Sequence, residues 1–255
     1  MRYNALMKRL IIVLAFLFSA SLPAQAPVAV PVGKEPHHHL VLENDYARVF
    51  RVSVPPHDAT LLHQHDLPYV YVSLGPADFI NAVAGKPEAR VVMTDGQVGY
   101  SRGGFAHIAR TDAGVPFDNI TIELLHPQGE PRNLCAQIVP GAASGGCGKA
   151  SGSADRGHGF SVEPQLETQE MSLDLVRLEP ETSSPKLALP SNSLLVCLNG
   201  TEVRIDVDGK PAKTLQGGEV IWIDGGVHGF ASNPSKKAST SIQLSFKDNG
   251  GGAKP

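Results

Sequence analysis

Short segments in which apolar and polar positions alternate follow one another along most of this chain. They are rich in Val, Ile, Tyr and Phe and are bounded by Gly, Pro, Asp or Asn, which is typical of short β-strands joined by turns. No window carries an apolar stripe at the helical period of about 3.6 residues over three turns. The predicted strands are Leu40–Leu42, Ala47–Val54, Tyr69–Leu74, Phe79–Ala84, Ala89–Met93, Gln97–Tyr100 and Asn119–Leu125 in the first half, and Phe160–Val162, Leu173–Leu178, Leu194–Leu198, Glu202–Val207, Glu219–Ile223 and Ser241–Phe246 in the second. The pattern predicts an all-β fold.

The two halves of the chain repeat one another. The block Gly96–Val98 matches Gly218–Val220 at an offset of 122 residues, and Tyr69–Gly75 matches Leu194–Gly200 at an offset of 125 residues. Matching turn glycines and matching strand alternation indicate that one supersecondary unit occurs twice. With 255 residues, the chain is long enough for two such domains.

The composition changes at the ends and in the middle of the chain. Residues 141–159 are rich in Gly, Ser and Ala and hold almost no large apolar side chain, as is typical of a linker. The predicted order is a signal peptide at 1–26, a disordered lead at 27–39, a first β-barrel domain at 40–140, a linker at 141–159, a second β-barrel domain at 160–247 and a flexible tail at 248–255.

The N-terminus has the pattern of a secretory signal peptide. Arg2, Lys8 and Arg9 precede the apolar run Leu10–Phe18, and small residues follow as far as Ala24–Ala26. The apolar run is shorter than the roughly 20 residues that span a bilayer. We therefore expect a cleaved, periplasmic or secreted protein whose mature chain has no membrane span.

The charge of the chain indicates which partners to expect. Three basic residues leave with the predicted signal peptide, so the formal net charge moves from −3 to −6. A mildly acidic chain without a cluster of Lys and Arg lacks the basic surface that nucleic-acid binders carry. A small molecule is the expected partner, because a barrel of this size has room for one small ligand at its mouth.

Three histidines are the candidate chemistry of the first half. His63 and His65 stand two residues apart, so on a strand both side chains face the same side. His107 follows Gly103 and Gly104, which permit a tight turn that brings it to the same place. Three converging imidazoles suit a divalent transition metal, namely Zn, Cu, Fe, Mn or Ni.

These residues resemble the two motifs of the cupin family, G-x5-H-x-H-x(3,4)-E-x6-G and G-x5-P-x-G-x2-H-x3-N. The matching residues are His63, His65 and Gly75 in the first motif and Gly96, Gly104 and His107 in the second. The resemblance covers about residues 40–126 and 160–247. It implies two tandem jelly-roll barrels, a bicupin, with His63, His65 and His107 as metal ligands.

The chain also departs from both motifs. The opening Gly and the Glu of the first motif, and the Pro and Asn of the second, are replaced by His57, Pro68, Arg102 and Thr111. The family's set of three His and one Glu is therefore reduced to three His. Three neutral imidazoles leave the charge of a divalent ion uncompensated, which favours Zn or Cu.

Further side chains are candidates for supporting roles. Asp66 or Tyr69 is a possible substitute for the missing carboxylate. His57 and Arg102 are candidates to orient a ligand residue or to contact a substrate, although an ordinary loop position is the alternative for His57. The run His37–His39 adjoins the predicted disordered lead and is interpreted as an exposed polar terminus that binds metal loosely at most.

The three cysteines divide into a pair and a single residue. Cys135 and Cys147 flank a Gly-rich stretch and are expected to form a disulfide in an oxidising compartment. Cys197 lies inside an apolar run and is expected to be a buried thiol. Nothing in this spacing indicates a catalytic cysteine.

The second half repeats the strand pattern without the candidate ligands. Ala188 and Pro190 are predicted where the first half has its His-x-His pair, and the repeat places His228 opposite Ala106 instead of the third histidine. One histidine does not hold a transition metal. The second barrel is therefore expected to be degenerate, either structural or an apolar pocket.

Three hypotheses for function follow. The first is an exported bicupin that binds a divalent metal and a small molecule in its first barrel. The second is a metal-dependent dioxygenase, or another cupin enzyme such as an isomerase or lyase, that acts on a small organic substrate. The third is a metal-free structural or interaction protein. Fold alone does not choose among them, because this fold serves many functions.

Overall fold

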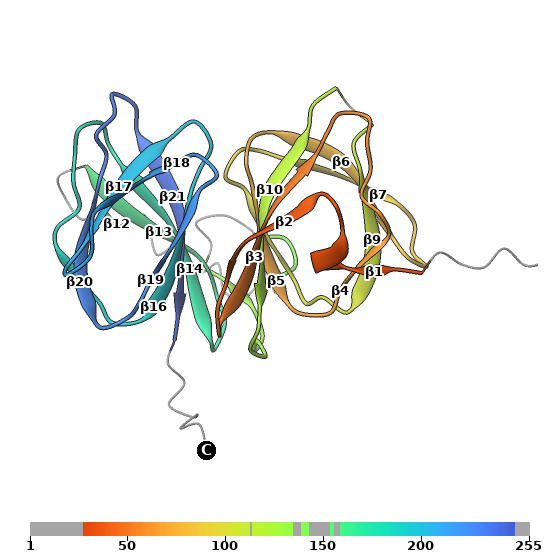
Figure 1. The fold of residues 1–255 in the computed structure, drawn as a ribbon, viewed down its shortest axis with the longest axis horizontal. Helices are drawn as coiled ribbons and strands as arrows, with labels where there is room; N and C mark the ends of the chain where they lie inside the picture. Colours follow the sequence, from red (N-terminus) through yellow and green to blue (C-terminus); the bar gives the residue numbers. More distant parts are fainter. Residues whose placement is uncertain (1–27, 113, 135–138, 143–153, 156–158, 248–255) are drawn as a thin grey trace, which may run out of the picture.

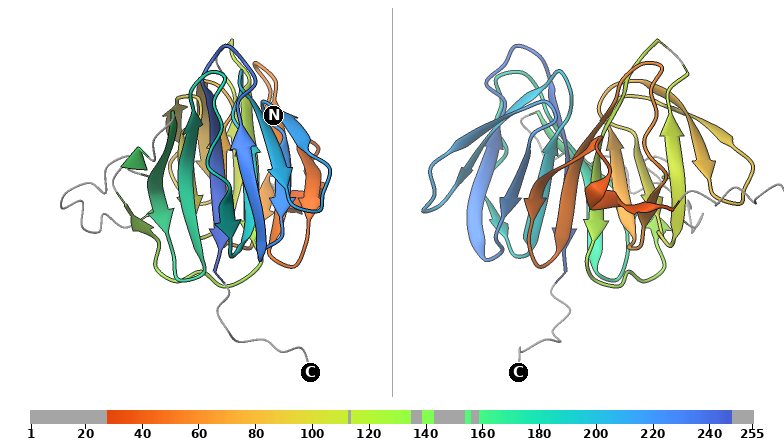
Figure 2. Two further views of the ribbon diagram at one scale, coloured as in Figure 1. Left: turned by 90° about the vertical axis from the view of Figure 1, so that its left-hand side faces the viewer. Right: turned by 45° about the vertical axis from the view of Figure 1, so that its right-hand side comes forward.

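The fold is that of a computed structural model, which describes residues 28–112, 114–134, 139–142, 154–155 and 159–247. These residues form four β-sheets and one short 3-10 helix, η1 (Val32–Lys34). The sheets pack in pairs into two barrels that lie side by side (Figures 1 and 2). The predicted all-β fold with two tandem barrels is confirmed. The predicted signal peptide, the predicted tail, most of the predicted linker and the pair Cys135 and Cys147 lie outside the described residues.

The first barrel has two five-stranded sheets. Their orders are β1-β4-β9-β6-β7 and β2-β3-β10-β5-β8. The strands of the first sheet are β1 (Val30–Pro31), β4 (His63–His65), β9 (Phe105–Arg110), β6 (Ala77–Val83) and β7 (Ala89–Met93). Those of the second sheet are β2 (His38–Glu43), β3 (Ala47–Val54), β10 (Phe117–Leu124), β5 (Tyr69–Ser73) and β8 (Val98–Ser101).

The second barrel has a larger and a smaller sheet. The larger sheet has the order β11-β13-β14-β21-β16-β19, with β12 also paired to β13, and the smaller has the order β15-β20-β17-β18. The strands of the larger sheet are β11 (Arg132–Asn133), β12 (Ala154–Asp155), β13 (Phe160–Glu167), β14 (Met171–Leu178), β21 (Ser239–Phe246), β16 (Asn192–Cys197) and β19 (Val220–Ile223). Those of the smaller sheet are β15 (Leu187–Leu189), β20 (Val227–Ser232), β17 (Glu202–Val207) and β18 (Lys213–Gln216).

Two of the predicted boundaries need correction. The predicted disordered lead, 27–39, is ordered from residue 28 onward and contributes β1, η1 and the start of β2 to the first barrel. Strand β11 lies in the range predicted for the first domain, but Arg132 and Asn133 pair with β13 of the second barrel. The larger sheet of the second barrel therefore begins before the predicted linker.

The two barrels share one apolar core. On β10, Ile120, Ile122 and Leu124 are fully buried, and they belong to the same cluster of side chains as Leu173 and Leu244 of the second barrel. Side chains alternate along a strand, so the other face of β10 points into the first barrel. One sheet of each barrel is thus covered on both faces, as the central strands β3, β10, β14 and β21 in Figure 1 show.

The interiors of the two barrels differ in polarity. Inside the first barrel, an apolar cluster that includes the stacked rings of Phe79 and Phe117 lies beside buried polar side chains such as Asn119 and Thr121. The second barrel is filled mainly by aliphatic side chains, among them the free thiol of Cys197, which is buried as expected.

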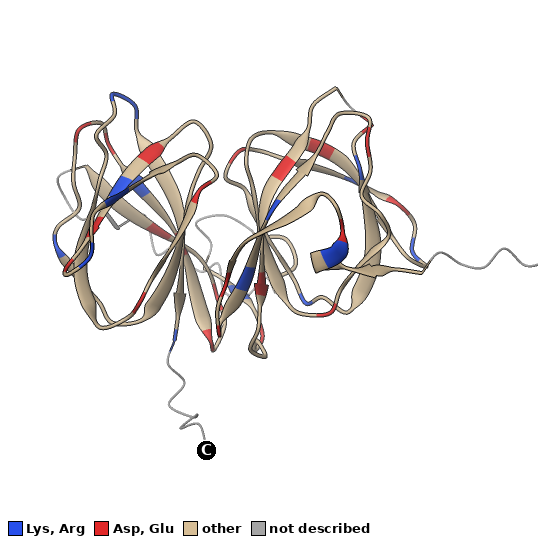
Figure 3. Ribbon diagram, in the orientation of Figure 1, with Lys and Arg blue, Asp and Glu red and all other residues tan. Residues whose placement is uncertain are grey.

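Charged residues of both signs are interspersed over the two barrels (Figure 3). Several form exposed ion pairs, for example Arg90 with Asp78 and Lys186 with Asp208, and such pairs contribute little stability each. Among the described residues, the one helix, η1, is far too short to cross a membrane.

The shared core predicts the effect of one truncation. Ile122→Ala removes a fully buried side chain between the barrels, and it should lower the free energy of unfolding by roughly 2–5 kcal/mol because a cavity remains. Val92→Ala, at an exposed position of β7, is the control and should change it by less than about 0.5 kcal/mol. Urea denaturation followed by circular dichroism measures both, and equal values would contradict a shared core.

Candidate metal centre

The pairing of β4 with β9 brings the three predicted ligands together. His63 lies directly opposite His107 in the antiparallel register, and His65 lies opposite Phe105. The ring centroid of His63 is 4.4 Å from that of His107 and 5.0 Å from that of His65, and the centroids of His65 and His107 are 5.2 Å apart. All three side chains are buried.

The glycine turn between β8 and β9 sets this register. Gly103 and Gly104 both have positive φ, the conformation that glycine adopts most readily, and the Gly104 N–H donates to the carbonyl oxygen of His65. A Cβ atom at Gly103 would overlap the carbonyl oxygen of Leu67. The turn therefore requires glycine at this position, which is the physical reason for the spacing seen in the sequence.

A fourth imidazole, His38, completes the cluster, and sequence reasoning missed it. Its side chain is only 5 % exposed, and its ring centroid is 4.7 Å from that of His63 and 5.9 Å from that of His65. Candidate ligand atoms of His38, His63 and His65 all lie within 4.8 Å of one another. The run His37–His39 is therefore not an exposed terminus, although His39 itself is exposed.

The useful signal was the strand alternation that continues N-terminally from Leu40–Leu42 into this run. Alternation predicts that either His38 alone or His37 and His39 together face inward. The composition of the adjoining Pro- and Val-rich segment hid this signal, because it favoured disorder.

Each imidazole has an oxygen atom behind its Nδ1. The Nδ1–H groups of His63, His107 and His38 donate to the Leu61 carbonyl oxygen at 2.9 Å, the Asn81 side-chain oxygen at 2.7 Å and the Glu35 carboxylate at 2.6 Å, respectively. The Nδ1 of His65 lies 3.8 Å from the carboxylate of Glu123. Outer partners of this kind orient the histidine ligands of metal sites and leave Nε2 free.

Burial lowers the pKa of three of the imidazoles, those of His38, His63 and His107. It is the largest cause that lowers the pKa of His63 to about 4, with the charge of His38 adding to it. Burial, and next the charge of His63, lower the pKa of His107 to about 2. Burial also lowers the pKa of His38, although the hydrogen bond to Glu35 opposes the shift. Neutral imidazoles are the form that binds metal ions.

Two buried carboxylates stand behind the histidines. Burial acts to raise the pKa of Glu35, but hydrogen bonds from His38 and from backbone N–H groups outweigh it and lower the pKa. Glu123 is 1 % exposed and pairs with Arg48 at 2.8 Å. Negative charge therefore lies next to the cluster even though no carboxylate occupies the motif position of Pro68.

The other sequence candidates are placed differently. Asp66 is exposed and so is not positioned as a buried ligand. Tyr69 is buried and stacks on His65 at a centroid distance of 4.3 Å, and burial raises the pKa of its hydroxyl. Arg102 is exposed and paired with Glu130 at 2.5 Å. His57 lies on an exposed turn with a φ of 61°, a conformation that glycine adopts more readily.

A cavity of about 220 Å³ adjoins the histidines. Its wall combines all four imidazoles with aromatic and neutral polar side chains. Besides the histidines, the lining includes Tyr69, Tyr71, Phe79, Phe105, Asn119 and Thr121. Neither His57 nor Arg102 belongs to this lining. The cavity is large enough for a small organic molecule and is partly apolar, as ligand pockets usually are.

The second barrel keeps the strand pairing but not the chemistry. Leu187 lies opposite Gly229, and Leu189 opposite Val227, in the pairing that corresponds to β4 with β9. The equivalents of the His-x-His pair are thus Leu187 and Leu189, not Ala188 and Pro190 as predicted. His228 pairs with Ala188 and is exposed. The corresponding cavity is apolar and measures about 70 Å³.

Known structures share this architecture. Comparison with protein-family models and with curated proteins finds no match in sequence. AerE from Microcystis aeruginosa is similar in fold, with a TM-score of 0.61, 11 % identity and coverage of 87 % of this chain and 98 % of that one. A cupin 2 conserved barrel domain protein from Leptotrichia buccalis has a TM-score of 0.50, 9 % identity and coverage of 86 % and 92 %. Salicylate 1,2-dioxygenase from Pseudaminobacter salicylatoxidans has a TM-score of 0.56, 12 % identity and coverage of 84 % and 77 %. The chain therefore has the cupin fold with two barrels, and the histidine cluster lies in the first of them.

Proposed function

We propose that the first barrel binds one divalent transition metal ion through His63, His65 and His107 and presents it to a small organic molecule. One observation carries the metal proposal. Within the part of the chain that the structure describes, the Nε2 atoms of His63 and His107 are buried and have no hydrogen-bond partner. A buried polar atom without a partner costs about 1–3 kcal/mol, and a metal ion bound between these atoms would remove that penalty.

The donor set indicates which ions fit. Imidazole nitrogen is a good ligand for Zn, Cu, Fe and Ni, whereas Mn favours oxygen ligands. The nitrogen donors therefore disfavour Mn. Among the remaining ions, the absence of a carboxylate at the motif position of Pro68 favours Zn or Cu. A bound ion would supply a Lewis acid with a coordination position open to a ligand.

The cavity supports the small-molecule part of the proposal. It lies directly against the histidines, so a ligand inside it would contact the metal. Rings such as Tyr71 and Phe105 offer flat apolar surface, and Asn119 and Thr121 offer hydrogen-bond partners. An aromatic or flat organic molecule with polar substituents fits this wall.

A metal-dependent dioxygenase is the second candidate. The observation that favours it is the aromatic cavity next to the histidines. Salicylate 1,2-dioxygenase, by its name an enzyme that acts on an aromatic compound, shares the fold. This candidate requires an ion that reacts with oxygen, so a site that retains only Zn would argue against it.

Export is part of the proposal because of the N-terminal sequence. The basic residues, short apolar run and small residues of 1–26 support a cleaved signal peptide. Cleavage near Ala26 would release a chain whose first strand, β1, begins at Val30.

Metal uptake is the primary test. Chelator-treated protein purified without a His-tag should take up one equivalent of Zn or Cu. At a free metal concentration about 100 times the Kd, the free energy of unfolding should rise by about 2.7 kcal/mol. His63→Ala and His107→Ala should abolish both effects, and His228→Ala, an exposed histidine of the second barrel, should not. Elemental analysis measures the bound metal, and calorimetry measures the change in stability.

Two outcomes would contradict this proposal. One is uptake by the His63→Ala and His107→Ala variants that equals uptake by the wild type. The other is the absence of any stability change with Zn, Cu, Fe, Mn or Ni, which would favour the metal-free structural hypothesis.

The cavity predicts a matched pair of variants. Val91 lines the cavity, whereas its neighbour Val92 is 64 % exposed. Val91→Phe should leave metal uptake unchanged and weaken catechol binding to the Cu-loaded protein at least about 10-fold, which corresponds to roughly 1.4 kcal/mol. Val92→Phe should change neither. Absorbance titration with catechol measures the affinity, and equal affinities for the two variants would place the ligand elsewhere.

Oxygen consumption separates the two candidate functions. A dioxygenase loaded with Fe should consume oxygen in step with the loss of an aromatic substrate such as catechol or a flavonoid, and His63→Ala should stop it. Binding without oxygen uptake for every loaded ion would favour a metal-dependent binding protein.

Export can be tested by cell fractionation. The full chain expressed in a bacterium with two membranes should appear in the periplasm, with an intact mass that lacks about the first 26 residues. Leu14→Arg interrupts the apolar run and should leave the uncleaved precursor in the cytoplasm. Uncleaved wild-type protein in the cytoplasm would contradict export.

A further inference from the structure

The segment that runs from residue 28 into the first two residues of β2 is docked against the strand that carries two of the proposed ligands. This segment, residues 28–39, is termed the N-terminal strap. Strand β1 pairs in parallel with β4, with Val30 next to His63, and the Val30 N–H donates to the Leu62 carbonyl oxygen at 3.0 Å. Val32 in η1 is 3 % exposed and packs in the core of the first barrel with Phe50. The strap is thus held at both a strand edge and the core (Figures 1 and 2).

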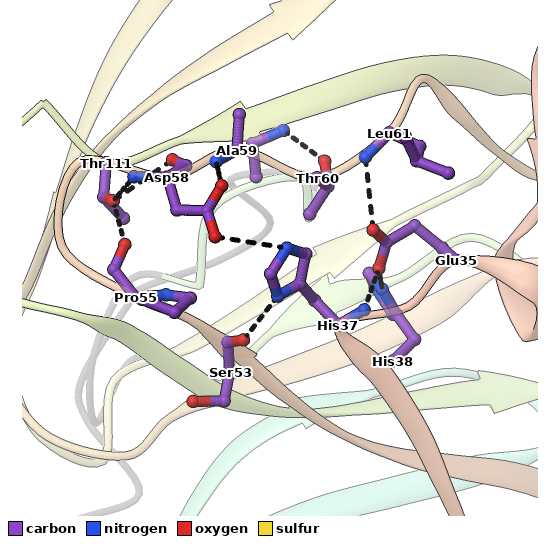
Figure 4. A network of polar contacts seen from close by, with 11 residues as sticks. Glu35, His37, His38, Ser53, Pro55, Asp58, Ala59, Thr60, Leu61 and Thr111 are labelled. Atoms are coloured by element: carbon purple, nitrogen blue, oxygen red, sulfur yellow. Dashed lines mark hydrogen bonds and ion pairs between the residues drawn. The ribbon is translucent and has the colours of Figure 1, made fainter.

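Glu35 is the polar centre of the strap. Its carboxylate is fully buried and accepts three hydrogen bonds, from the N–H of His37 at 2.8 Å, from Nδ1 of His38 at 2.6 Å and from the N–H of Leu61 at 3.1 Å (Figure 4). The carbonyl oxygen of Leu61 in turn accepts from Nδ1 of His63 at 2.9 Å. One carboxylate therefore holds His38 directly and His63 through a single backbone residue.

His37 anchors the same region from the other side. Its Nδ1 donates to the carbonyl oxygen of Ser53 at 2.9 Å, and its Nε2 lies 3.8 Å from the carboxylate of Asp58 (Figure 4). His37 is therefore engaged away from the cluster, and His39 is exposed. Of the three consecutive histidines, only His38 reaches the metal centre.

We propose that His38 is a fourth metal ligand and that Glu35 is its positioning residue, so that the strap completes the metal site from outside the two cupin motifs. This inference rests on the proposed metal-binding function. His38 would supply a fourth ligand in a chain that has Pro68 instead of the motif Glu. Glu35 supplies negative charge in place of that missing carboxylate. It is not itself a ligand but accepts a hydrogen bond from the His38 imidazole.

The geometry links metal binding to docking of the strap. A metal ion bound by His38 together with His63 and His65 would tie the strap to β4. Amide hydrogens of β1 and η1 should then exchange more slowly in the metal-loaded protein than in the metal-free protein, because opening the strap would require loss of a ligand.

Copper provides a spectroscopic test in the wild-type full-length mature protein. The electron paramagnetic resonance spectrum of one equivalent of Cu(II), in a buffer without nitrogen ligands, should show four coordinated nitrogens. His38→Ala should reduce the count to three and weaken Zn binding at least about 10-fold in a chelator competition assay, and Glu35→Gln should weaken it by about 10–100-fold. His39→Ala, on the same strand but exposed, should match the wild type.

The outcomes separate this inference from the proposed function. A wild-type spectrum with three nitrogens, or a His38→Ala variant with wild-type spectrum and affinity, would overturn the role of His38 while the triad site stands. If every variant, His63→Ala included, still binds metal as the wild type does, both this inference and the proposed metal-binding function are overturned. If His38→Ala does not fold, the nitrogen count of the wild type decides.

Discussion

The antiparallel pairing of β4 with β9 is the constraint on which the candidate site depends. Side chains alternate along strands, so a slip of one residue would turn His63, His65 and His107 away from the interior. The Gly103–Gly104 turn prevents this slip, because it fits against the backbone of Leu67 only without a side chain. The second barrel keeps the same pairing with leucines and glycine in these places. The scaffold is therefore independent of the chemistry that it carries.

The sequence was sufficient for what depends on local alternation. The strands, the duplication and the convergence of His63, His65 and His107 follow from periods of two residues and from turn glycines. His38 depends instead on how β2 aligns with β3, and that pairing contains a bulge between Leu40 and Leu42 that shifts the alternation. No local pattern reveals a bulge or the parallel pairing of β1 with β4. Likewise, no local pattern shows that Asp66 and Arg102 are exposed.

The electrostatics of the cluster differ from those of a site with a carboxylate ligand. Burial favours the neutral imidazoles of His38, His63 and His107, and the carboxylates of Glu35 and Glu123 lie behind His38 and His65. A divalent ion at the centre would be surrounded by neutral donors and, farther out, by negative charge that is partly balanced by Arg48. Such a layered arrangement favours ions that prefer nitrogen, and it leaves the adjoining cavity wall free of fixed charge.

The core between the barrels is completed only when the second barrel has been synthesised. All of the proposed ligands lie in the first 107 residues, so they leave the ribosome before the strands of the second barrel do. Until the second barrel folds against β10, the apolar side chains of Ile120, Ile122 and Leu124 would be exposed to water. An exposed apolar surface of this kind promotes aggregation. The second barrel thus covers the apolar outer face of β10 whatever side chains its own interior holds.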